Sequence, residues 1–325
     1  MKKLNVTYSN ANRVESTRGA RSRKDGILRR YMNKKYLFIM FLPVFLYYFI
    51  FHYAPMYGVM IAFKDYQFLQ GAFRSPWVGF AHFNELFHTE YFWTVLKNTL
   101  IINGYKLLFG FPAPIAMALL LNEVMQPVFK KVVQTISYIP HFLSWVVLSG
   151  LVIEFLSPSR GPINMVITLL GGEPIFFVAD ENWFRSILVA TEIWKHVGFN
   201  TIIYLAAIAG INPEMYEAAK VDGISRLQAM RYITLPSIAP VIIIMLILSS
   251  GSIINDDFEQ VFNLLNVKVM DVGDVLSTYT YSEGLVRMNY SYAAAVGLFK
   301  NVVALAIVLT VNAIARRIRK DSAIF

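Results

Sequence analysis

The sequence predicts an all-α, polytopic membrane protein with six transmembrane helices. Three observations support this fold class: 56% of the 325 residues are hydrophobic, only 16% are charged, and the charges leave six long stretches nearly free of them. In water such stretches would need a very large buried core, whereas a bilayer accepts them directly. They cover residues 36–63, 98–121, 133–156, 186–210, 236–254 and 292–315.

The first apolar stretch, residues 36–63, is longer than a bilayer requires. As a helix it would measure about 42 Å at about 1.5 Å per residue, against a hydrocarbon core of about 30 Å. It also contains Pro43 and Pro55, which disturb helical hydrogen bonding. We therefore expect a kinked or tilted helix that runs out into the interface.

Basic residues mark one side of the predicted helices. Most of the 30 lysines and arginines lie before residue 36, between residues 122 and 132, between residues 211 and 235, and after residue 315. Because cytoplasmic segments carry this excess, we expect both termini in the cytoplasm, which agrees with an even number of spans. The net charge of +9 therefore reflects membrane topology, and no nucleic-acid partner is expected.

Residues 1–34 form a polar, basic tail, which we expect to be largely disordered. It could set the orientation and attract anionic membrane lipid, or it could bind a regulatory partner. Residues 35–97 would then form the first transmembrane helix and an external loop, and residues 98–325 a five-helix core. The external connections 65–92 and 157–184 could hold interfacial aromatic residues or a docking surface.

Metal and disulfide chemistry have little support in the sequence. The chain has no cysteine, and its five histidines show no His-Glu-x-x-His pattern. We therefore expect no metal site.

The connection 211–236 between the fourth and fifth spans has helix signals of its own. Asn212-Pro213 ends one helix and begins another, since proline suits a first turn and Glu214 is favourable near its positive end. Gly223 ends this short helix, because glycine readily adopts a positive φ.

A second short helix, predicted over residues 225–232, then returns the chain to Leu235-Pro236. Ala218 and Ala219 on the first helix are small enough to let another surface approach closely. The predicted product is a helix–glycine–helix elbow on the cytoplasmic face.

The spacing of this elbow resembles the signature of the permease subunits of ABC importers. It reads Glu217-Ala218-Ala219, three residues, Gly223, nine residues, then Ile233-Thr-Leu235-Pro236. The resemblance implies that the elbow is a coupling helix, which seats in a groove of a separate ATPase subunit. The coupling residues it implies are Glu217, Ala218, Ala219, Asp222, Gly223, Leu235 and Pro236.

Residues 193–200, followed by Ile211-Asn-Pro, resemble the carbohydrate branch of these permeases, which is related to the maltose permeases. This implies an oligosaccharide cargo, an extracytoplasmic sugar-binding protein, a second permease subunit and two ATPase subunits, in a bacterial inner membrane. ATP and Mg²⁺ would belong to the ATPase subunits, with no cofactor and no catalysis in this chain. In agreement, the sequence has no Gly-x-x-x-x-Gly-Lys-Ser/Thr motif.

Four charged residues fall within or near the predicted spans: Lys106, Glu192, Lys195 and Lys300. Intramembrane charges usually face a partner or a cavity. Glu192 and Lys195 are three residues apart, so we expect them to pair on one helix face. Lys106 and Lys300 could reach the interface or another subunit.

An oligosaccharide pathway needs hydrogen-bonding groups beside aromatic platforms. The fourth and fifth spans offer both, or else small polar residues that only pack between helices. Near the end of the fifth span, acidic residues could instead cap a helix or bind the external protein. The pathway candidates are Trp194, Lys195, Phe199, Asn200, Ser249, Ser252, Asn255 and Asp256.

Two other functions stay open at this point. An ABC importer for amino acids, peptides or inorganic anions would carry the same elbow. A secondary transporter would show inverted repeats and would have no use for the elbow.

Overall fold

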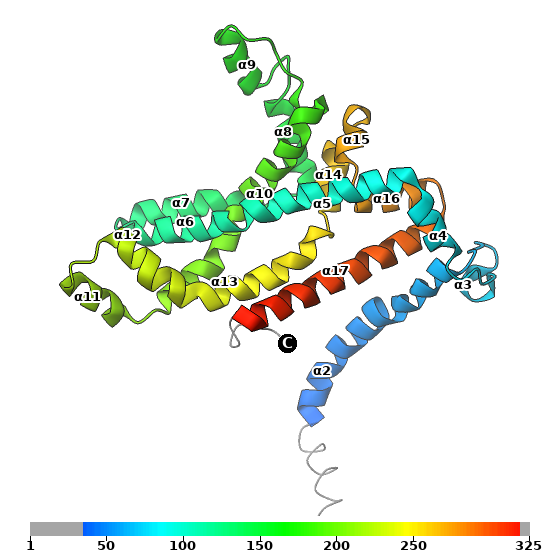
Figure 1. The fold of residues 1–325 in the computed structure, drawn as a ribbon, viewed down its shortest axis with the longest axis horizontal. Coiled ribbons are helices and arrows are strands. Elements are labelled where there is room, and N and C mark those ends of the chain that lie inside the picture. The colour runs from blue at the N-terminus through cyan, green and yellow to red at the C-terminus, as the bar shows by residue number, and fades with distance from the viewer. Residues whose placement is uncertain (1–34, 319–325) are drawn as a thin grey trace, which may run out of the picture. The chain divides into compact units, whose positions relative to one another are not determined.

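The computed structural model describes residues 35–318, which form helices and short connections (Figure 1). Within them the one β feature is an isolated antiparallel bridge between Lys64 and Trp77. The chain divides into a short N-terminal unit that ends at Val59 and a larger unit that begins at Met60. The predicted basic tail, residues 1–34, lies outside the described residues.

The first span changes helix type along its length. α2 (Lys35–Tyr48) continues into the π-helix η1 (Phe49–Tyr53) and the 3₁₀-helix η2 (Ala54–Phe63). The π turn immediately precedes Pro55, whose ring would clash with the carbonyl of the preceding turn in a regular α-helix. The irregularity expected from the prolines is therefore a change of hydrogen bonding near Pro55.

In the described part of the larger unit, helices of very different lengths are joined by short connections. Their bounds are α3 (Gly71–Arg74), α4 (Ala81–His88), α5 (Glu90–Gly110), α6 (Pro112–Glu123), α7 (Pro127–Tyr138), η3 (Ile139–Phe142), α8 (Trp145–Phe155), α9 (Pro162–Leu169), η4 (Phe177–Ala179), α10 (Glu181–Ala209), α11 (Pro213–Val221), α12 (Arg226–Ala229), η5 (Met230–Thr234), α13 (Leu235–Ser250), η6 (Gly251–Ile253), α14 (Phe258–Leu264), η7 (Val267–Val269), α15 (Met270–Gly273), α16 (Leu276–Tyr281), η8 (Ser282–Val286) and α17 (Tyr290–Ile318).

Four helical runs in residues 35–318 are long and apolar enough to cross a membrane: Tyr36–Phe63, Glu90–Glu123, Arg226–Ile253 and Tyr290–Arg317. α10 has 29 residues, enough to span a bilayer, but its polar residues lower its apolar character. The prediction of an all-α membrane protein is confirmed, whereas the count of six spans stays a prediction. The predicted division at residues 97 and 98, which also stays a prediction, falls inside α5.

The predicted third span, residues 133–156, is not one helix. Pro127–Phe142 and Trp145–Phe155 meet at an angle of 106°, and together they could form a fifth, broken span. The break has a local cause: Leu143 and Ser144 are extended, and the Ser144 hydroxyl accepts from the Val147 N–H at 3.4 Å. This cap starts a new helix, so the prediction of a continuous span was wrong.

Three apolar clusters hold the larger unit together. One joins α10 to η4 and α14 around Phe177 and Val261, and a second joins α4, α5, α16 and α17 around Phe92. The third packs α6, α10 and α13 around Tyr204 and Ile238. In Figure 1, α13 (yellow) and α17 (red) lie side by side, as their contacts require. α10 is in contact with α5, α6, α7 and α13. This central position allows α10 to line a cavity.

Candidate functional site

The elbow between α10 and α13 is built from the capping signals in its sequence. The Asn212 side chain accepts from the Glu214 N–H at 3.1 Å and begins α11, with Pro213 in the first turn. Gly223, at φ +74°, follows the end of the helix. The Ile224 N–H then donates to the Ala219 carbonyl at 3.0 Å, which closes the C-terminal turn.

The second part of the elbow differs from its prediction. Ser225 and Gln228 form a reciprocal capping box at the start of α12, but no separate short helix ends before Pro236. Instead, residues Arg226–Ile253 form one helical run of 28 residues. The π-helix η5 lies just before Pro236 and gives its ring room inside the run.

The two alanines of the elbow face different ways. Ala219 is buried against its own chain, whereas Ala218 and Glu217 are exposed. Tyr216 bonds through its hydroxyl to that of buried Thr234, at 2.9 Å, so α11 is tied to the start of the long helix. Of the other predicted coupling residues, Asp222 and Pro236 are exposed and Leu235 is half-buried.

α11 and α12 both expose large apolar side chains. Val221 is 89% exposed and Leu227 is 74% exposed. Together with Ala218 they give the elbow an outer surface on which another protein could pack.

A cavity of about 410 Å³ lies between α5, α10 and the end of α13. Its wall combines polar groups with two aromatic rings, those of Phe111 and Tyr204. Five predicted pathway residues line this cavity: Asn200, Ser249, Ser252, Asn255 and Asp256.

The other three predicted pathway residues lie outside the cavity. Trp194 is 47% exposed on another face of α10. Lys195 and Phe199 share a face, as their spacing predicts, but that face is turned toward the broken span. The Lys195 ammonium lies 4.3 Å from the centre of the Trp145 ring, and Phe199 stacks on His141 at 3.8 Å.

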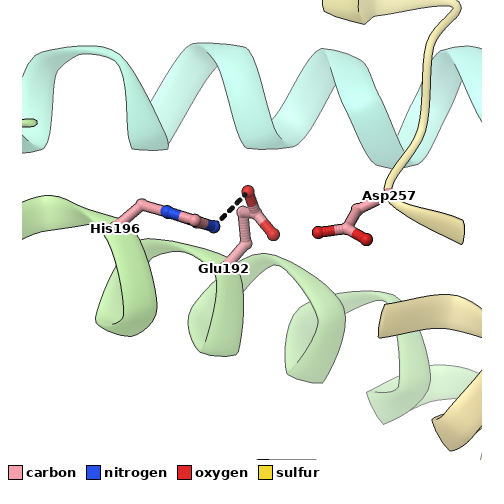
Figure 2. Close-up of side chains that lie close together, drawn as sticks. All are labelled: Glu192, His196 and Asp257. Atoms are coloured by element: carbon pink, nitrogen blue, oxygen red, sulfur yellow. Dashed lines mark ion pairs between the residues drawn. The ribbon is translucent and has the colours of Figure 1, made fainter. Parts of the chain in front are cut away.

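The prediction of a Glu192–Lys195 pair was wrong. Glu192 pairs with Lys106 of α5 at 3.8 Å and with His196 at 3.5 Å. His196 is one turn beyond Glu192 and points the same way (Figure 2), whereas the Lys195 ammonium lies over the Trp145 ring. Lys106 also donates to the Gln260 side chain, so it bonds within its own subunit.

The acidic pair after α13 has two separate roles. The Asp256 carboxylate is buried, lies 3.8 Å from the Lys300 ammonium and accepts from Ser277. Asp257 caps α14, accepting from the Gln260 N–H at 3.4 Å, and also accepts from the Trp145 indole. The capping role was one of the alternatives open from the sequence.

Sequence reasoning missed several residues of the cavity wall, among them Asn103, His196 and Tyr204, and it did not place Lys106 among the pathway candidates. A signal was present in α10, where polar residues recur at every fourth position: Glu192, His196, Asn200 and Tyr204. Residues four apart lie on one helix face, and this face lines the cavity.

Comparison with known proteins supports a transport role for this fold. Residues 110–320 match the family described as "Binding-protein-dependent transport system inner membrane component". The chain belongs to this family. It is a membrane permease component, as the elbow's resemblance implied.

Individual relatives match nearly the whole chain. The polygalacturonan/rhamnogalacturonan transport system permease protein YteP of Bacillus subtilis is 43% identical over 98% of this chain and 99% of its own. A chain of a bacterial ABC transporter involved in the import of the acidic polysaccharide alginate is 43% identical, with a TM-score of 0.85 over 90% of this chain and 99% of its own. A structure of a bacterial alginate ABC transporter in complex with an alginate pentasaccharide-bound periplasmic protein also matches. Its matching chain is 43% identical, with a TM-score of 0.83 over 90% of this chain and 98% of its own.

Proposed function

We propose that this chain is one permease subunit of an ATP-driven importer, and that it translocates an oligosaccharide delivered by an extracytoplasmic binding protein. The observation that carries the proposal is the cavity between α5, α10 and α13. Amide and hydroxyl groups of Asn103, Asn200 and Ser252 stand there beside the rings of Phe111 and Tyr204. A sugar presents hydroxyls and apolar ring faces, and this wall offers a partner to each.

The relatives support the cargo class. Two of them are named for polysaccharide transport, one of them for an acidic polysaccharide. Acidic oligosaccharides are therefore the first cargo to test. The cavity itself does not select for anions, because Lys106, the lysine on its wall, is paired with Glu192 of the same chain.

ATP hydrolysis would occur in two separate ATPase subunits, each seated against a permease elbow, with ATP and Mg²⁺ bound there. The exposed face of α11 and α12, with Glu217, Ala218 and Leu227, is the surface proposed for this contact. A second permease subunit would complete the pathway. Both termini would lie in the cytoplasm, on the side of the elbow.

The test is transport by the reconstituted complex. Proteoliposomes with ATP on the ATPase side would receive the external binding protein and labelled acidic or neutral oligosaccharides. We expect uptake of an oligosaccharide that stops when the ATPase subunits or the binding protein are omitted. Uptake of amino acids or inorganic anions alone would overturn the cargo class, and uptake without the ATPase would overturn the importer mechanism.

A further inference from the structure

Three side chains on the cavity wall point toward one another: Glu192, His196 and Asp257 (Figure 2). The first two lie one turn apart on α10, and Asp257 comes from the cap of α14. The His196 Nε2 atom lies 3.5 Å from a Glu192 carboxylate oxygen. One ligand atom from each of the three residues lies within 4.8 Å of the other two.

These atoms form a donor set that metals use. One imidazole nitrogen and two carboxylate oxygens are ordinary ligands of Zn²⁺ and of similar divalent ions. In a tetrahedral site with bonds of about 2.0 Å, neighbouring ligand atoms lie about 3.3 Å apart. The Glu192–His196 separation is close to this value, and small side-chain rotations would bring Asp257 to it.

Neighbouring groups hold two of the three side chains in place. The His196 Nδ1 atom lies 3.2 Å from Nδ1 of His141. If His196 donates this bond, its Nε2 lone pair is directed to the cavity. Asp257 accepts from the Trp145 indole and from the Gln260 backbone. Such outer contacts orient metal ligands in known sites.

Charges of both signs surround the three side chains. Two carboxylates meet here, and Lys106 is the cation at ion-pair distance from Glu192, at 3.8 Å. The Glu192 oxygen that faces Lys106 is buried without a hydrogen bond. Lys195 is also near: its ammonium lies 4.3 Å from the centre of the Trp145 ring, and the Trp145 indole donates to Asp257. A divalent ion would neutralise both carboxylates.

We propose that Glu192, His196 and Asp257 bind a divalent transition-metal ion, with Zn²⁺ as its representative. Three protein ligands leave a coordination position, which would face the cavity and accept an oxygen of water or of a cargo molecule. The sequence analysis expected no metal site, and no local pattern could indicate this one, because Asp257 is distant from α10 along the chain. The proposal does not depend on the identity of the cargo.

The test measures metal binding to the assembled permease complex without transport. After chelation, the complex would be titrated with Zn²⁺ by equilibrium dialysis and with Co²⁺ by visible absorption. We expect one ion per copy of this chain. Glu192→Gln and His196→Gln should each weaken binding at least about tenfold, and His141→Gln by about 10- to 100-fold, as expected for an outer contact.

His88→Gln is the matched control, because His88 lies at the end of α4 and bonds to the Asn84 carbonyl at 2.7 Å. This variant should bind metal like the wild type. If Glu192→Gln fails to assemble, His196→Gln and the wild-type Co²⁺ spectrum decide the question. The proposal is overturned if the wild type binds no ion, or if a properly assembled His196→Gln complex binds Zn²⁺ as tightly as the wild type.

Discussion

At Gly223 the backbone φ of +74° lies in the left-handed region, yet an added Cβ would meet no atom within 4 Å. At this residue an added side chain would have enough room, but the backbone conformation would be unfavourable for it. A side chain would be strained by the backbone alone, at a cost of about 1–2 kcal/mol. The turn that orients α11 therefore requires glycine because of its positive φ, and not because a larger side chain would clash.

We predict that Gly223→Ala lowers transport by roughly 5- to 30-fold, the population change that such a cost produces. Membrane insertion should be unaffected. The measurement is cargo uptake, together with cargo-stimulated ATP hydrolysis, by the reconstituted complex. Gly150→Ala is the control, because Gly150 lies in α8 with nothing within 4 Å of an added Cβ and no positive φ. Equal coupling in the two variants would mean that the elbow does not transmit hydrolysis.

At the scale of the elements, α10 shows what the sequence predicts and what it leaves undecided. The signals at Asn212-Pro213 and Gly223 predicted the start and the end of α11 correctly, because a cap involves only neighbouring residues. The face that α10 turns to the cavity depends on its neighbours. Lys195 was therefore assigned to the wrong side, and the partners of Glu192 were missed.

The broken span shows a second limit. Ser144 is a recognisable helix start, but the apolar run around it favoured a single helix. Long-range pairs, such as Asp256 with Lys300, join segments that no local pattern connects. Of the cavity, the sequence therefore predicted the polar stripe near the end of α13 and only Asn200 of α10.

Close packing of α10 on α7 depends on Gly198. An added Cβ there would lie 2.1 Å from the backbone oxygen of Ser137, so the helices would have to separate. We predict that Gly198→Ala destabilises the fold by about 1–3 kcal/mol, as overpacking does. Thermal unfolding of the purified protein measures this loss.

Gly104→Ala is the control for Gly198, since Gly104 lies in α5 and its added Cβ would meet nothing within 4 Å. It should unfold at or above the wild-type temperature, because alanine favours a helix more than glycine does. A Gly198→Ala protein that is as stable as Gly104→Ala would contradict the close approach of α7 and α10.

The bond between Tyr216 and Thr234 links α11 to the long helix. Tyr216→Phe removes the hydroxyl and keeps the ring, at a cost of about 0.5–1.5 kcal/mol. We predict that the amount of cargo transported per ATP falls by about two- to tenfold. Tyr232→Phe should change nothing, because Tyr232 is 65% exposed. If both variants transport alike, the link is not used in coupling.

At the scale of the whole molecule, the elbow and the cavity share two helices. The run Arg226–Ile253 begins in the elbow and ends at the cavity, 28 residues later, which is about 42 Å of helix. α10 leads from the cavity wall to the other end of the elbow. Movement imposed on α11 by an ATPase could therefore reach the cavity through two continuous helices.

The central claim, that this cavity is part of the cargo pathway, can be tested directly because the chain has no cysteine. A cysteine at Ser252, on the cavity wall, would be the only thiol of the chain. Its reaction with a charged, membrane-impermeant thiol reagent can be followed in the transporting complex. Ser186→Cys is the control, since Ser186 is exposed on α10 and does not line the cavity.

We predict that cargo slows the labelling of Ser252→Cys during turnover and that complete labelling stops uptake. Labelling of Ser186→Cys should leave uptake unchanged. Full labelling of Ser252→Cys with uptake at the unlabelled rate would contradict the account.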